Sequence, residues 1–454
     1  MKNPLFFSIF RPISIFSLAL CLMFLASCNK EDDIPAITTD IWFSESRGFY
    51  LDLENGANAL YSTSEAGTIL FDDDFDLEDF DLIETTDELS VLSKGSLSPI
   101  IFKRVSELPE ITPPTTNPQI NFDFFWNTFN DYYAFFNERG VDWEAQKNLR
   151  ETVTESNLLD VLSQTILLLE DGHVNILTPD YYLNSGMYRM GERLNAYLDP
   201  ADQITESDQV EEIFEDKNDV ITSKYLNGNV ESLPGYPIYW GKIEEGVGYL
   251  NILEMTEFGG DVGLETSLAN VELAMDEIMQ FIQNENIEKF IIDVRFNGGG
   301  EDLVSLEIAA RFFDQERPVF SKKARDGNGF TPEYFAKVAP KGDFQFTKDI
   351  VLLTGPFTAS AAEIFSLAMQ ELPHTTVVGE FTEGVFSDVL PHALPNGTQI
   401  TLSNEVYLDA SGNSLETIGV GPKTTANTIP FLKSSDIHNG TDGGIERALE
   451  VLKQ

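Results

Sequence analysis

The stretch DIVLLTGPFTASAAE, residues 349–363, combines a strand pattern and a helix start. The run 349–353 is almost wholly apolar, which is typical of a buried strand. Gly355 and Pro356 then interrupt the strand. We expect a helix over 361–370, so that Ser360 stands at its N-terminus, where first-turn N–H groups have no intrahelical partner.

The same alternation continues on both sides of this stretch. Strand patterns and helix patterns follow one another, with strands expected at 247–253, 289–294 and 375–378 and helices at 262–282 and 303–313. Alternation of this kind predicts an α/β layered domain with at least partly parallel strands.

The N-terminal half has a different pattern. Short strand-like runs separated by turn residues predict a small β domain. A Pro/Thr-rich linker follows, and then aromatic residues at helical spacing between 122 and 136, which indicate a core helix. A second helix is expected over 158–169. We divide the chain into a signal peptide (1–27), acidic tether (28–38), β domain (39–108), linker (109–120), helical peptidase segment (121–180), polar connecting segment (181–240) and α/β core (241–454).

The N-terminus looks like an export signal. Lys2 and Arg11 precede the apolar run 13–24, as in a signal peptide. The run ends in LASC (25–28), which resembles a bacterial lipobox and predicts a lipid on Cys28. An ordinary signal peptide or a short membrane anchor are the alternatives. We therefore expect an exported lipoprotein, held in the outer membrane on its periplasmic or cell-surface face.

The composition limits the partners. The chain has 29 Lys+Arg against 75 Asp+Glu, a net charge of −46. Such a surface repels phosphate backbones, so nucleic-acid binding is disfavoured. We expect no cofactor and no metal. The only cysteines, Cys21 and Cys28, lie in the leader and at the lipid site, so the mature chain should have no disulfide.

Ser360 has two interpretations. A serine at a helix start can attack a carbonyl carbon while the N–H of Ala361 stabilises the oxyanion. Alternatively, Ser360 and Glu363 form a capping box with no chemical role.

A second motif, DVRFNGGG at 293–300, opens a buried strand into three glycines. Glycine lets the backbone approach a ligand closely, so Gly298 and Gly299 could offer oxyanion donors. A plain strand-to-helix turn is the alternative. The pattern lacks the spacing of a phosphate-binding loop.

Together these motifs resemble a known family. Asp-x-Arg-x-Asn-x-Gly-Gly, then Ser-Ala-x-Glu, then Gly-Glu-x-Thr-x-Gly at 379–384 is similar to the C-terminal processing (tail-specific) peptidases, over about 122–454. The resemblance implies that Ser360 is the nucleophile and that Ala361, Gly298 and Gly299 form the oxyanion hole. It also implies a crotonase-like β-superhelix core of strand–strand–helix units.

The general base is expected to be histidine. In the lysine-using branch of the family, a lysine follows the Gly-x-x-Thr-x-Gly segment, but here Val385 stands in that place. The tricorn-like branch uses a histidine in an Asp-Gly-His motif, and residues 171–173 match it. An imidazole with a pKa near about 6.5 can accept a proton at neutral pH. We therefore predict His173 as the base; His374, His392 and His438 lack such a context.

The resemblance also implies an orienting acid. Glu416 precedes a Gly-Val-x-Pro segment, as the acid of the family's site does; an ordinary surface glutamate is the alternative. The segment 181–239 holds no PDZ-type carboxylate-binding loop. We predict a cell-envelope serine endopeptidase or peptide-trimming hydrolase that acts on peptides or unfolded proteins. The alternatives are a catalytically silent lipoprotein that binds peptides or glycans, and a crotonase-like enzyme acting on acyl thioesters.

Overall fold

The computed structural model describes residues 40–454, except 55–57, 78–79, 207 and 261. The predicted signal peptide, Cys28 and the acidic tether lie outside the described residues. Within the described part of the chain, no helix has both the length and the apolar character needed to cross a bilayer.

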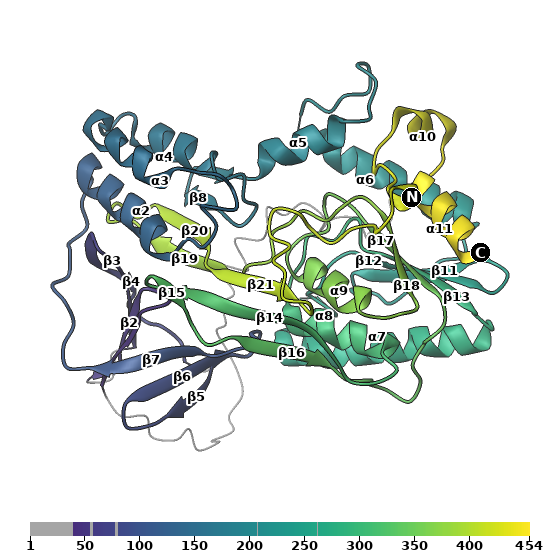
Figure 1. Ribbon diagram of the computed structural model, residues 1–454, viewed down its shortest axis with the longest axis horizontal. Coiled ribbons are helices and arrows are strands. Elements are labelled where there is room, and N and C mark those ends of the chain that lie inside the picture. Colours follow the sequence, from purple (N-terminus) through teal and green to yellow (C-terminus); the bar gives the residue numbers. More distant parts are fainter. Residues whose placement is uncertain (1–39, 55–57, 78–79, 207, 261) are drawn as a thin grey trace.

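The predicted α/β layered domain is confirmed. Its six-stranded sheet has the order β10-β11-β12-β13-β17-β18 (Figure 1), in which β12 to β18 pair in parallel and β10 to β12 antiparallel. The strands are β10 (Glu231–Ser232), β11 (Ile238–Glu244), β12 (Val247–Ile252), β13 (Lys289–Asp293), β17 (Ile350–Thr354) and β18 (Thr375–Gly379).

Helices cover both faces of this sheet. Alternate side chains of β13 and β17 belong to two different hydrophobic clusters, with Ile292 and Leu352 on one face and Ile291 and Leu353 on the other. One face is covered by α7 (Leu264–Asn284), α8 (Asp302–Ala309) and α9 (Ala361–Gln370), and the other by α6 (Asp208–Val220) and α11 (Gly443–Leu452). Burial on both faces explains why these strands are almost continuously apolar.

The predicted N-terminal β domain is also present. It is an antiparallel sheet of order β4-β3-β2-β1-β7-β6-β5, seen at the lower left of Figure 1. The strands are β1 (Ile41–Ser44), β2 (Phe49–Asp52), β3 (Ala59–Ser64), β4 (Gly67–Asp72), β5 (Phe80–Glu84), β6 (Glu88–Ser93) and β7 (Ile100–Val105). Buried Trp42 and Phe49 of this sheet share one hydrophobic cluster with α2 (Pro118–Tyr132).

Two smaller sheets lie between these units. One has the order β19-β20-β8-β9, and in the other β14 pairs with β15, β16 and β21. Their strands are β8 (Asn175–Thr178), β9 (Tyr181–Asn184), β14 (Arg317–Asp326), β15 (Gly329–Phe330), β16 (Tyr334–Val338), β19 (Val389–Ala393), β20 (Gln399–Ser403) and β21 (Glu405–Asp409). The described residues also form the α-helices α3 (Trp143–Gln146), α4 (Leu158–Ile166), α5 (Met187–Asn195) and α10 (Ser434–Asn439). The segment interpreted as a polar connection thus contains two helices, α5 and α6.

Candidate active site

Ser360 occupies a strained turn between β17 and α9. Its φ of 52° and ψ of −126° lie in a region that residues with a side chain rarely adopt. Such a conformation costs about 1–3 kcal/mol and is concentrated at functional sites. A sharp strand-to-helix turn of this kind is how a nucleophilic serine is exposed in the nucleophile elbow of other hydrolases.

Only half of the capping box is present, because the Ser360 N–H interacts with the Glu363 carboxylate but the serine hydroxyl is not used. The Ser360 side chain makes no capping hydrogen bond to α9. The Glu363 carboxylate instead accepts hydrogen bonds from the main-chain N–H groups of Gly384 and Val385, both at 2.8 Å, and from the Thr382 hydroxyl. Burial raises the pKa of Glu363 to about 7, while these bonds and the Ser360 N–H lower it. Glu363 therefore ties the first turn of α9 to the segment 382–385.

The glycine-rich loop lies directly against the serine. Gly299 has a φ of +111°, and a Cβ added there would lie 2.7 Å from the Ser360 Cβ and 3.1 Å from the Ala361 nitrogen. Only glycine fits at this contact. The Gly299 N–H, however, donates to the Asn297 side chain at 2.9 Å. Of the predicted oxyanion donors, Gly298 and Ala361 are thus the two whose N–H groups have no acceptor among the described residues.

His173 lies in a buried turn between α4 and β8. Its main-chain N–H donates a hydrogen bond to the Asp171 carboxylate at 2.9 Å. Its carbonyl oxygen accepts a hydrogen bond from the Thr401 hydroxyl at 2.7 Å. Burial lowers the pKa of the imidazole, opposed by the Asp171 charge and by the main chain of Ser387. A lowered pKa favours the neutral imidazole, which is the form that a general base needs.

Ser360 and His173 approach the same segment, residues 382–387. Glu363, one turn after Ser360, holds the N–H groups at 384 and 385, while the imidazole interacts with the main chain of Ser387. Among the residues that the structure describes, no hydrogen bond joins the Ser360 hydroxyl to the imidazole, and the buried His173 Nδ1 has no partner. Catalytic hydrogen bonds often tighten only when substrate binds.

Glu416 lies in a buried charge network beside the histidine turn. Its carboxylate accepts a hydrogen bond from the Arg139 guanidinium at 2.6 Å and one from the Phe386 N–H at 3.0 Å. Burial raises the pKa of Glu416, and the Arg139 guanidinium opposes this rise. The acid interacts with Arg139 and Phe386, so any orienting effect on the His173 ring passes through other residues.

Arg139 and Tyr133 are parts of the site that the sequence analysis missed. Arg139 donates to the carbonyls of Leu169 at 3.1 Å and Glu170 at 2.7 Å, and lies 3.3 Å from the Asp171 carboxylate. The Tyr133 hydroxyl donates to the same carboxylate at 2.8 Å. The turn that carries His173 is therefore clamped by side chains from the end of α2 and the loop after it.

The other candidate bases lie elsewhere or carry a fixed charge. His392 is stacked between the rings of Phe49 and Tyr132, and burial lowers its pKa to about 3. Lys322 is buried and pairs with Asp388 at 2.7 Å and Glu405 at 2.9 Å, which raises its pKa. A lysine held charged in this way cannot accept a proton.

Comparison with known proteins identifies related sequences and folds. Residues 246–426 match the model of Peptidase family S41. The chain is 25% identical over 183 residues to a carboxy-terminal-processing protease of Bartonella bacilliformis, covering 40% of this chain and 39% of the relative. It is 24% identical over 241 residues to a carboxyl-terminal-processing protease of Picosynechococcus, and the match covers 52% of this chain and 53% of the relative. The chain thus matches about half or less of the length of these curated relatives.

Solved structures share the fold over a longer range. A protein from Parabacteroides merdae assigned as a peptidase has a TM-score of 0.60 at 23% identity, covering 75% of this chain and 98% of the other. Mature CPAF complexed with lactacystin has a TM-score of 0.51 at 14% identity, and the match covers 74% of this chain and 97% of the other. At these identities, the likeness concerns the fold.

Proposed function

We propose that the chain is a serine peptidase of family S41, whose model matches residues 246–426, and that Ser360 attacks the carbonyl carbon of a peptide bond. The observation that carries this proposal is the Ser360 conformation, with a positive φ at the start of α9 and a hydroxyl not used as a cap. Strain at one serine needs a reason, and exposure of a nucleophile supplies one.

In the proposed mechanism, His173 takes the Ser360 proton as the hydroxyl oxygen bonds to the carbonyl carbon. The charge on the carbonyl oxygen is stabilised by the N–H groups of Ala361 and Gly298. The intermediate collapses, the C–N bond breaks, and the imidazolium gives its proton to the leaving amine. Water, deprotonated by the same imidazole, then hydrolyses the acyl-enzyme. Glu416 acts as a positioning residue through Arg139.

The test is covalent labelling with a fluorophosphonate, which reacts with an activated serine. We expect one label per chain, located on Ser360 by peptide mapping, and no label in Ser360→Ala. Ser435→Ala, at an exposed serine on α10, is the matched control and should label normally. Labelling of another residue, or none in folded protein, would favour the silent peptide- or glycan-binding alternative.

We also propose that the chain is exported and carries a lipid on Cys28. The support is the LASC segment after the apolar run 13–24. Cys28→Ser should move the protein from the membrane fraction to the soluble fraction while leaving it folded. Wild-type protein that stays soluble with residues 1–27 attached would refute the anchor.

The finer fold assignment is likewise a proposal. We propose that the core is a crotonase-like superhelix, and the succession β11, β12 and α7 is one strand–strand–helix unit in support of it. An experimental structure superposed on crotonase-like enzymes tests this; a different strand order in the core would contradict it.

A further inference from the structure

The N-terminal β domain is in contact with the sheet that follows the histidine turn. In this sheet β19 pairs with β20, and β20 pairs with β8, which begins two residues after His173. β4 of the β domain lies beside β19 (Figure 1). The β domain therefore borders the layer that positions the proposed base.

One contact across this border is made by His392 of β19. Its ring is stacked between Phe49 of β2 and Tyr132 of α2, with ring centroids 4.9 Å and 5.2 Å away. The Ser62 hydroxyl of β3 lies 2.6 Å from the His392 Nδ1. His392 is fully buried, so the β domain encloses a side chain of the neighbouring sheet.

The second contact is a buried arginine in the turn between β1 and β2. The Arg47 guanidinium donates hydrogen bonds to the side chains of Asn404 and Glu405. Arg47 is 9% exposed and Glu405 is 2% exposed. The next residue, Gly48, has a φ of +67°, and an added Cβ there would lie 2.4 Å from the Tyr132 ring. The close approach of this turn to α2 thus directs the arginine to the start of β21.

The strand that receives Arg47 also holds the histidine turn. The Thr401 hydroxyl donates to the His173 carbonyl at 2.7 Å, and the Ser403 hydroxyl donates to the Asp171 carboxylate at 3.1 Å. Side chains two residues apart on a strand lie on the same face. One face of this strand therefore contacts the histidine turn at two points.

The segment next to the imidazole is held by the same strand. The Glu405 N–H donates to the Ser387 hydroxyl at 2.9 Å, and the main chain of Ser387 interacts with the His173 imidazole. The residue whose carboxylate accepts a hydrogen bond from Arg47 thus fixes, through its own N–H, the segment beside the proposed base.

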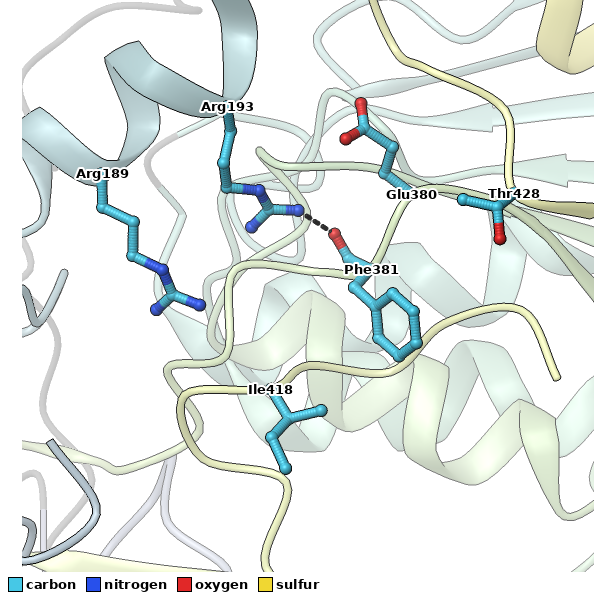
Figure 2. A pocket seen from close by; sticks show the side chains of 6 residues that line it. All are labelled: Arg189, Arg193, Glu380, Phe381, Ile418 and Thr428. Atoms are coloured by element: carbon cyan, nitrogen blue, oxygen red, sulfur yellow. Dashed lines mark hydrogen bonds between the residues drawn. The ribbon is translucent and has the colours of Figure 1, made fainter. Parts of the chain in front are cut away.

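The other end of that segment, at residue 382, is held by α5. Arg193 donates to the carbonyl of Thr382 at 3.0 Å and to that of Phe381, and Figure 2 shows its guanidinium directed to the Phe381 carbonyl. The two ends are therefore held by different parts of the molecule. The end near the nucleophile is held by α5, and the end near the imidazole is held by a strand that the β domain contacts.

The charge of Glu405 does not depend on Arg47 alone. Lys322 lies 2.9 Å from the Glu405 carboxylate and 2.7 Å from that of Asp388. Loss of the guanidinium therefore leaves Glu405 with a cation, and the fold should survive the change. The interaction that is lost is the fork of N–H donors that holds Asn404 and Glu405 together, which a lysine ammonium does not reproduce.

We propose that Arg47 is a positioning residue of the peptidase: through the strand at 401–405, the N-terminal β domain holds His173 where it can take the Ser360 proton. This inference rests on the proposed function. A catalytic group displaced by about 1 Å can lose about 100-fold in rate. A contact remote from the reacting atoms can therefore control the reaction.

The test is the rate of fluorophosphonate labelling of Ser360 at increasing probe concentration, which separates the limiting rate from the affinity for the probe. Arg47→Gln should lower the limiting rate about 10-fold to 100-fold and leave the affinity unchanged. Arg47→Lys, which keeps the charge without the fork, should give an intermediate rate. Arg104→Gln is the matched control, because this arginine pairs with Glu84 of the same β domain, and it should label at the wild-type rate.

A second comparison separates positioning from a general structural role. If Arg47 acts through the imidazole, Arg47→Gln should cause no further loss in the His173→Ala variant. Ser62→Ala is a milder change at the same border, should slow labelling with the same dependence on His173, and carries the test if Arg47→Gln does not fold.

Two results would overturn the proposal. One is labelling of the folded variant at the wild-type rate, and the other is the same factor of loss with and without His173. Failure of the peptidase proposal would appear differently, as wild-type protein that is not labelled at Ser360 or as His173→Ala that labels at the wild-type rate.

Discussion

The serine side and the histidine side of the candidate site are built in different ways. Ser360, Gly299 and Glu363 lie in two strand-to-helix turns, and short sequence motifs set their geometry. The histidine turn is held by partners distant in sequence: Arg139 and Glu416 are 277 residues apart, and Ser403 donates to Asp171 across 232 residues. Local motifs fix the position of the proposed nucleophile, whereas tertiary packing fixes the position of the proposed base.

Removing Arg139 should damage the histidine side most. Its side chain is 3% exposed and interacts with both Asp171 and Glu416, so Arg139→Gln leaves two buried acids without their cation. Loss of one member of a buried pair costs about 3–5 kcal/mol. Denaturant unfolding should show this loss, with slower cleavage in the folded fraction. Arg150→Gln, at a half-exposed pair, is the control; equal stability of the two variants would contradict the clamp.

A methyl group at Gly299 should damage the serine side without touching the histidine. The added Cβ would lie 2.7 Å from the Ser360 Cβ, at a φ of +111°. Displacing the nucleophile by about 1 Å can cost about 100-fold in rate. Gly191→Ala, on α5, is the control, because nothing lies within 4 Å of its added Cβ and its φ is not positive. Kinetic measurement of both variants should separate them, and similar rates would argue against the contact.

Glu383 links the two sides and should give a smaller, pH-dependent effect. Its side chain packs on Gly172, and its main-chain N–H donates to Thr358. Burial, with repulsion from Glu363 and Asp171, raises the pKa of Glu383 to about 7. A raised pKa means that its contribution to stability is present below the unfolded value near 4.5 and is lost as pH rises through about 7.

Glu383→Gln should therefore flatten the fall in unfolding free energy between about pH 4.5 and 7, by about 1–3 kcal/mol. Thermal and denaturant unfolding at several pH values measure this. Glu155→Gln, at an exposed position, should leave the slope unchanged. An unchanged slope in Glu383→Gln would show that this carboxyl is not the group responsible.

The same difference explains what the sequence could predict. The helix expected over 361–370 has these bounds in the structure, and the strands at 247, 289 and 375 begin where their apolar runs begin. Periodicity and glycine signals act locally, so they can be read from one chain. The acceptor of the Gly299 N–H, Asn297, and the clamp by Arg139 depend on side-chain geometry and distant contacts that no local pattern encodes.

The polar segment between the histidine turn and the core shows a further limit. The sequence predicts only a polar connection without a PDZ loop, yet the segment contains α5 and α6. The charged residues of α5 do not indicate a structural role by themselves. In the structure, Arg189 and Arg193 donate hydrogen bonds to main-chain carbonyls of loops about 190 to 230 residues away. Their meaning appears only when those loops are in place.

The central claim is that His173 activates Ser360, and the rate of fluorophosphonate labelling from pH 5 to 9 tests it most directly. In wild-type protein, we expect a constant rate near neutral pH and a fall only below about pH 6.5, because burial lowers the imidazole pKa. His173→Ala should label Ser360 about 1,000-fold more slowly or worse at every pH. His438→Ala, at an exposed histidine, should match wild type. Labelling of His173→Ala at the wild-type rate, or a wild-type rate that rises only toward pH 8 to 9, would contradict the account.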